Sequence, residues 1–310
     1  MHLFTVFTAA CNRPNELQRL YNSLIRQTNK DFVWLIVDDS TNVDVHITVE
    51  SFINEGVIKI EYYKQEHRGK FWAQKKGFSS VKTPYMLDVD DDDELTEDCI
   101  EVLLNEWKKI ENEGDTEIGV ICGRIEYEDG RKEDCFQGRP CFDTDFIEIE
   151  WTYNHPCDNL ISRKLEVIKN VNIFSFNDEW FTNQVALVRE CVLWNRVARK
   201  YKSRYLDYPL MICHTDTENR LSSTAFGKQK CIDYMFSNRV FLNELGDRLW
   251  ENPKGAVKYM AEYMACGTAL GFSPIILLNK IEDRKLKIIG GMLWPAALLV
   301  GGYFRIKYFY

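Results

Sequence analysis

The chain has 310 residues and 45% hydrophobic content, enough for a substantial core, which excludes a disordered protein. Its formal net charge of −8 excludes a general nucleic-acid binder, because such proteins need a basic surface to bind phosphates. Ten cysteines are scattered without a CxxC pair, which argues against a zinc site and indicates reduced thiols in the cytoplasm. The N-terminal segment lacks a basic leader, so we expect no signal peptide.

The first third of the chain alternates strand and helix patterns. Short apolar runs predict strands at Leu3–Ala9, Phe32–Val37, Ile58–Tyr63 and Tyr85–Val89. Apolar residues at helical spacing predict helices at Asn15–Gln27, Phe71–Ser80 and Thr96–Glu113. Repeated strand–helix units predict an α/β fold with a doubly wound, mostly parallel sheet that is flanked by helices.

The middle of the chain is less regular. After an apolar run at Ile118–Cys122, residues 123–160 mix glycine, proline, aromatic and acidic residues without a period. We expect loops that shape a second substrate pocket there. A helical pattern returns at Asn183–Lys202, with apolar positions such as Val188 and Val192.

Two acidic clusters follow predicted strands: VDDSTN at 37–42 and LDVDDDDEL at 87–95. Ligands of doubly wound sheets bind beyond the carboxyl ends of the strands, so we expect both clusters to lie at one site. A run of Asp is also typical of a solvated surface or a helix start. Carboxylates in a shared crevice, however, repel one another unless a divalent cation or a proton compensates their charge.

The second cluster is not an EF-hand. Asp88, Asp90 and Asp92 have the 1-3-5 spacing of such a calcium loop, but its sixth position is Asp93 instead of Gly and its twelfth is Cys99 instead of Glu. A cation held by one or two carboxylates and by a diphosphate fits better, and Mn²⁺ or Mg²⁺ prefers such oxygen ligands.

Four segments in this order, VFTAACNRP, LIVDDST, HRGKFWAQKKG and MLDVDDDDEL, jointly resemble the inverting glycosyltransferase family 2, which has a GT-A fold. The resemblance covers about residues 1–220. It implies a nucleotide-diphosphate sugar donor, with a UDP-sugar favoured, and a glycan or lipid-linked acceptor in bacterial surface polysaccharide synthesis. We therefore expect a catalytic domain at 1–225, with a nucleotide-binding half at about 1–120 and an acceptor half at about 121–225.

The resemblance also assigns roles at the donor site. Ala9 and Asn12 would lie beside the nucleotide, and Asp39 would accept a hydrogen bond from its base. Lys70 would contact the diphosphate or the base. The acidic run would continue the site, with Asp88 beside the ribose and with Asp90 and Asp91 at the metal.

In the family, the catalytic base lies in a helix start of the type E-D-x-x-L-W-x-R. This chain has RECVLWNR, and aligning the Leu-Trp-x-Arg part places Glu190 at the base position, with Arg189 where the family often has Glu. Because of that departure, Asp178 and Glu179 stay open as alternatives. A general base must take the acceptor proton while the hydroxyl attacks the anomeric carbon.

Two further segments carry expectations from the resemblance. In YLDYPLMICHTDTENRLSS a strand should end at His214, a metal or diphosphate contact, with Asp216 as the alternate. The HPCDN stretch should line the acceptor side, where Asp158 is the candidate residue.

The C-terminal region, 226–310, is predicted to be helical and to end in a basic, apolar tail. Residues 280–310 hold six Lys or Arg against two acidic residues, and Ile288–Phe304 is an uncharged run of 17 residues. We expect a membrane-surface or re-entrant anchor on the inner face of the cell membrane, with the rest of the protein in the cytoplasm. A buried helical hairpin is the alternative, since Pro295 and several glycines weaken a long helix.

Three other functions are weighed against this one. A dinucleotide-binding protein would have a G-x-G-x-x-G turn after the first strand, and this chain has none there. A nucleotidylyltransferase that acts on a sugar phosphate also uses a strand-end Asp pair with Mg²⁺, but AACNRPNE is poor in the glycine and lysine that hold a triphosphate. A non-catalytic carbohydrate-binding protein stays open.

Overall fold

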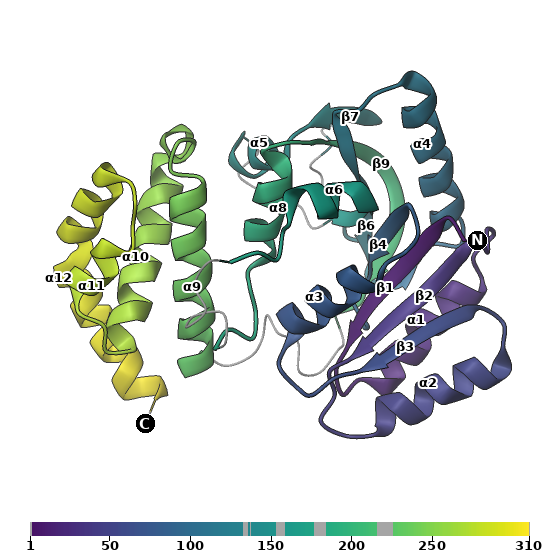
Figure 1. Ribbon diagram of the computed structural model, residues 1–310, viewed down its shortest axis with the longest axis horizontal. Helices are drawn as coiled ribbons and strands as arrows, with labels where there is room; N and C mark the ends of the chain where they lie inside the picture. Colours follow the sequence, from purple (N-terminus) through teal and green to yellow (C-terminus); the bar gives the residue numbers. More distant parts are fainter. Residues whose placement is uncertain are drawn as a thin grey trace. The chain divides into compact units, whose positions relative to one another are not determined.

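A computed structural model describes residues 2–132, 136, 138–152, 159–176, 184–215 and 226–309. The chain divides into two compact units, which are described separately. The first consists of Met1–Ile173 and Val197–Glu218, and the second of Phe174–Arg196 and Asn219–Tyr310. Figure 1 shows a mixed α/β architecture for the first unit and helices for the second.

The first unit is built on a nine-stranded sheet with the order β3-β2-β1-β4-β8-β6-β9-β5, and β7 pairs with β9 beside this path. The strands are β1 (Phe4–Ala10), β2 (Phe32–Asp38), β3 (Lys59–Lys64), β4 (Tyr85–Asp88), β5 (Glu94–Leu95), β6 (Ile118–Tyr127), β7 (Cys141–Thr144), β8 (Asn159–Lys164) and β9 (Lys202–Cys213). Strands β1 to β4 pair in parallel, as does β6 with β9. The pairings of β5, β7 and β8 are antiparallel.

Helices cover both faces of the first four strands. α1 (Pro14–Ile25), α2 (Asp44–Glu55) and α4 (Cys99–Glu113) share one hydrophobic cluster with β1, β2 and β4, so they lie on the same face. α3 (Lys70–Ser80) lies on the opposite face, where Phe78 meets the Phe7 ring edge-on with 5.4 Å between the centroids. Two short helices, α5 (Phe146–Thr152) and α6 (Leu165–Val171), also belong to this unit.

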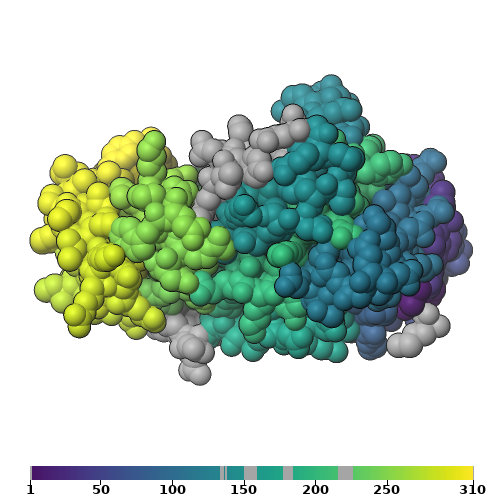
Figure 2. All heavy atoms as spheres, turned by 90° about the horizontal axis from the view of Figure 1, so that it is seen from above, coloured from purple at the N-terminus to yellow at the C-terminus, as the bar shows by residue number. Residues whose placement is uncertain are grey.

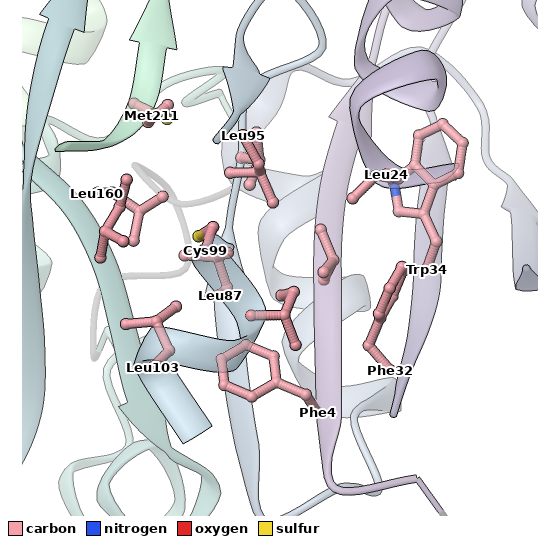
Figure 3. Packing of buried hydrophobic residues seen from close by; sticks show 14 of the residues in the cluster. Phe4, Leu24, Phe32, Trp34, Leu87, Leu95, Cys99, Leu103, Leu160 and Met211 are labelled. Atoms are coloured by element: carbon pink, nitrogen blue, oxygen red, sulfur yellow. The ribbon is translucent and has the colours of Figure 1, made fainter. Parts of the chain in front are cut away.

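The core of the first unit lies between the sheet and this first layer of helices (Figure 3). Phe4 of β1 and Phe32 and Trp34 of β2 are at most 1% exposed, and Leu24 of α1 and Leu103 of α4 close over them. Because successive side chains of a strand alternate between its faces, full burial of β2 requires cover on both faces, which α3 provides opposite α1 and α2.

The structure confirms the α/β fold and corrects the reading of the middle of the chain. Residues 123–160 are not only loops, because β6 continues to Tyr127 and because β7, α5 and the start of β8 lie in this stretch. The predicted helix Asn183–Lys202 was too long: α8 spans only Glu190–Ala198, and Lys202 already begins β9. Val185 and Val188 are buried without belonging to that helix.

The described helices of the second unit are most of α8 (Glu190–Ala198), α9 (Lys228–Glu244), the short 3₁₀ helix η1 (Leu249–Glu251), α10 (Pro253–Ala269), α11 (Pro274–Asn279) and α12 (Arg284–Tyr308). α10 packs against both α9 and α12, and Figure 2 shows these C-terminal helices as one filled body. α12 contains the predicted apolar run as one continuous helix through Pro295, not as a hairpin. Among the described residues, it is the one helix long and apolar enough to cross a membrane by length and composition.

Candidate active site

The two acidic clusters meet where the strand order reverses. β1 lies between β2 and β4, with Ala10 opposite Asp38 on one side and Phe7 opposite Asp88 on the other. The chain proceeds from β1 to β2 and β3 and then crosses to β4, so the carboxyl ends of these strands frame a switch point. The backbone N–H of Cys11, which follows β1, donates to Asp91 Oδ2 at 3.1 Å, and the next amide, of Asn12, donates to Ser40 Oγ at 2.8 Å, so the turn after β1 contacts both clusters.

Basic residues from distant parts of the chain each pair with a different carboxylate of the second acidic cluster. Asp88 lies 3.1 Å from Arg163 Nη1 of β8, whose side chain is fully buried. Asp90 is 51% exposed and lies 2.8 Å from Lys70 Nζ at the start of α3. Asp91 accepts a hydrogen bond from Arg13 Nη1 at 2.9 Å.

Nearby cations offset only part of the effect of burial at the buried end of the run. Burial raises the pKa of Asp91 to about 7. Arg13 and the Cys11 amide lower this pKa, while the charges of Asp90 and Asp92 raise it further. Burial also raises the pKa of Asp93 to about 8. A divalent cation would supply further positive charge, and carboxylate oxygens are the ligands that Mg²⁺ and Mn²⁺ prefer.

Asp39 connects β2 to the loop that precedes α3. Its Oδ1 accepts hydrogen bonds from Gln65 Nε2 at 2.7 Å and from the Arg68 amide at 2.9 Å, and its Oδ2 accepts one from the Gly69 amide at 2.8 Å. Gly69 has φ 100°, which a residue with a side chain rarely adopts. The buried Asp39 carboxylate therefore fixes the HRGK stretch and aims Lys70 at the acidic run.

Asp38 performs a similar role one residue earlier. Burial alone would raise the pKa of this carboxyl, but hydrogen bonds from Ser40, Tyr62 and Lys64 outweigh burial and hold it below its usual range. The Tyr62 hydroxyl donates to Asp38 Oδ2 at 2.6 Å. Asp38 thus stays charged and secures the end of β3 against β2.

The turn after β1 supplies the other wall of the site. Asn12 has φ 57°, and its amide donates to Ser40 Oγ at 2.8 Å while its Oδ1 accepts from the Thr41 amide at 3.0 Å. Ala9 is the one partly exposed residue within β1. These contacts hold Asn12 against Ser40 and Thr41 of the first cluster.

His214 occupies a different set of contacts. Its Nε2 lies 2.8 Å from Glu94 Oε1 and its Nδ1 lies 2.9 Å from Glu128 Oε2. Asp90, Asp91 and His214 do not form a group with ligand atoms within 4.8 Å of one another. Within the described residues, only Cys11, Asp39 and His67 form such a group, and the Asp39 carboxylate there is already occupied by the loop amides.

Glu190 begins α8 and belongs to the second unit, with its side chain exposed. Arg189, which replaces the usual acidic residue, reaches Asn238 Oδ1 of α9 and Glu262 Oε2 of α10, each at 3.2 Å. The other candidate acidic residues, Asp158, Asp178, Glu179 and Asp216, lie outside the described residues.

Comparison with known proteins decides the family. The family model described as "Glycosyl transferase family 2" matches residues 5–217. The chain belongs to this family. The match confirms the resemblance that the four motifs indicated, and it makes the protein a glycosyltransferase.

A curated relative and several solved structures agree with the family. Glycosyltransferase GlyA of Streptococcus pneumoniae serotype 4 is 32% identical over 117 residues, which are 37% of this chain but only 16% of that protein. Residues 1–349 of TarS from S. aureus, in complex with UDP-GlcNAc, match with a TM-score of 0.65 and 17% identity over 100% of this chain and 93% of that one. The mannosyltransferase PcManGT of Pyrobaculum calidifontis, in complex with GDP-Man and Mn²⁺, has a TM-score of 0.50 and 13% identity over 98% and 87% of the two chains. These structural matches show the shared GT-A fold.

The sequence reasoning missed several residues that contact the candidate carboxylates, namely Arg13, Arg163 and Gln65. Arg13 stands in the quoted ACNRP motif, and its cation next to a strand-end turn could have been paired with the acidic run. Arg163 and Gln65 carry no such signal, because an exposed surface position is the ordinary expectation for both residue types.

Proposed function

We propose that this enzyme is an inverting, metal-dependent glycosyltransferase with a UDP-sugar as donor. The carrying observation is the junction of the two clusters at the switch point, where Cys11, Arg13 and Lys70 hold Asp90 and Asp91 beside the Asp39 loop. The TarS structures with UDP-GlcNAc and with UDP support uracil as the base of the donor nucleotide, since they share the fold.

In this proposal the chain's own residues bind and orient the donor. Asn12 and Asp39 flank the nucleotide, and the Lys70 ammonium contacts the diphosphate. Asp90 and Asp91 would hold Mn²⁺ or Mg²⁺, which would stabilise charge on the departing diphosphate. The Asp90 carboxylate is half-exposed and so is accessible for this role.

Glu190 is proposed as the general base. Its carboxylate takes the proton of the acceptor hydroxyl while that oxygen forms a bond to the anomeric carbon and the bond to the nucleotide diphosphate breaks. Attack opposite the leaving group inverts the anomeric centre, so an α-linked donor gives a β-linked product.

The test combines binding and turnover. UDP, GDP, dTDP, CDP and ADP are added to the protein with and without Mn²⁺, and the unfolding midpoint is measured. A ligand at about a hundred times its dissociation constant adds about 2.7 kcal/mol, so UDP should raise the midpoint most and only with Mn²⁺. No shift with any nucleotide would overturn the donor assignment.

Glu190→Gln tests the base separately. We expect turnover to fall by about 10²-fold or more with an unchanged UDP-induced shift, because the general base is lost while donor binding is retained. Turnover near that of the unmodified protein would remove Glu190 from this role.

We further propose that α12 attaches the enzyme to the cytoplasmic face of the bacterial membrane, where a lipid-linked acceptor of surface polysaccharide synthesis would lie. Met292, Leu299 and Ile306 follow one another every seventh residue and are 75%, 79% and 77% exposed. Basic residues flank this apolar stripe at both ends of the helix, which suits anionic lipid. Leu299→Asp should reduce co-flotation with phosphatidylglycerol vesicles; undiminished flotation would contradict the anchor.

A further inference from the structure

A groove lies on the outer side of the loop that Asp39 holds. It measures about 460 Å³ and is lined by Gln65, Glu66, Arg68, Trp72, Lys75, Lys76 and Ser79, which come from the end of β3, the loop and the exposed face of α3. Small-ligand sites have volumes of about 300–1,000 Å³, so one sugar phosphate can be accommodated.

Three of the residues that line the groove carry a positive charge. Within the part of the chain that the structure describes, Arg68, Lys75 and Lys76 form no ion pair, and Glu66 is the one carboxylate in the lining. The lining therefore has a net charge of +2 in a protein whose net charge is −8. Such a concentration of positive charge attracts anions. The Asp39 carboxylate holds the loop in place through other groups, so the fold of the loop does not account for these charges.

Trp72 arranges these cations. The Arg68 guanidinium lies 3.6 Å from the centre of the Trp72 ring, and Lys75 Nζ lies 5.4 Å from it. Lys76 Nζ is held by the Lys64 carbonyl at 2.9 Å. The charged groups are thus positioned by contacts that leave hydrogen-bond donors for a ligand, and a planar guanidinium with nearby ammonium groups matches a phosphate.

We propose that this groove is a phosphate-binding site, additional to the diphosphate subsite of the donor, that takes a phosphate group carried by a sugar or by a lipid. Its ligand reports to the donor site through Gln65 and Arg68, because both residues line the groove and also donate to Asp39. This coupling rests on the proposed function, whereas phosphate binding does not.

The test follows Trp72 in protein labelled with 5-fluorotryptophan, by fluorine NMR, with Trp72→Phe to assign its signal. Glucose 1-phosphate and inorganic phosphate represent soluble sources, and phosphatidylglycerol vesicles represent a lipid source, each compared with sodium chloride of equal ionic strength. We expect the Trp72 signal to shift with a phosphate source and not with chloride. A response to the soluble phosphates or to the vesicles alone supports the site and identifies which source it takes.

The variant Lys75→Gln/Lys76→Gln should weaken this response at least tenfold, while Lys108→Gln/Lys109→Gln on α4 is the matched control and should leave it unchanged. A response that is equal in both variants, or one that chloride reproduces, overturns the proposal. Repeating the titration with saturating UDP separates the two hypotheses. If UDP does not bind but the Trp72 signal still responds to phosphate, the donor-site assignment is contradicted. If UDP binds but the Trp72 signal does not respond to phosphate, the groove is contradicted.

Discussion

Asp39→Asn provides a sharp test of how the donor-site loop is held. The substitution keeps the side-chain shape but replaces one acceptor oxygen with an NH₂ group, which would face an amide N–H of Arg68 or Gly69. Depending on which oxygen is replaced, one or two charge-assisted hydrogen bonds are lost, each of them about 1.5–3 kcal/mol, and the others weaken without the charge. We expect a loss of about 2–4 kcal/mol in the free energy of unfolding.

The measurement is a thermal midpoint together with hydrogen exchange. A loss of this size lowers the midpoint by about 5–10 °C for a unit of this length. The amides of Arg68 and Gly69 should exchange at least tenfold faster, since local opening no longer breaks those bonds. Glu66→Gln is the matched control, because it removes the same charge from an exposed position of the same loop. Unchanged midpoint and unchanged protection in Asp39→Asn would refute the proposed role of this carboxylate.

Three other substitutions test the fold at other points. Tyr62→Phe removes a hydroxyl that lowers the pKa of Asp38, so its cost of about 1–2 kcal/mol should be present above the unfolded pKa of 3.8 and should shrink as the pH falls below it, measured by urea unfolding at several pH values. Arg189→Glu should destabilise the second unit by about 1–3 kcal/mol, and adding Glu262→Arg should restore at least half of the loss of midpoint, unless their 3.2 Å contact contributes nothing. Gly301→Ala places a Cβ 2.7 Å from a backbone oxygen of α10 and should cost about 1–3 kcal/mol, whereas alanine at position 302, with nothing within 4 Å, should not destabilise.

The sequence predicts the first four strands and the location of the acidic residues, because both depend on local patterns. Apolar runs that end in Asp place the clusters at the carboxyl edge of a parallel sheet, and the register of β1 with its neighbours agrees. The partners of those carboxylates are not predictable in this way. Arg13 and Asp91 are 78 residues apart, and Gln65 and Asp39 are 26 apart, so only the tertiary fold brings them together.

The irregular middle of the chain defeats local patterns for a related reason. β7 has four residues with only partial burial, and β8 reads NLISRK, with polar residues at most of its positions. Its Arg163 is fully buried because the chain returns antiparallel to β4, where Asp88 compensates the guanidinium charge. A buried arginine is predictable only when its acidic partner is already known.

In the second unit, the C-terminal helices pack against the segment before Glu190 as well as against α12. α9 has buried polar residues where a helix in a hydrophobic interior would ordinarily have apolar ones, and their contacts explain them. Asp233 accepts a hydrogen bond from the Ala186 amide at 3.0 Å, and Ser237 Oγ accepts one from the Arg189 amide at 3.1 Å. Without α9 these partly buried amides would lose their acceptors, and an unpartnered group that is fully buried costs about 1–3 kcal/mol. The helices beyond residue 225 therefore support the backbone that leads into Glu190, so removing them would disturb the proposed base even in an enzyme that needs no membrane.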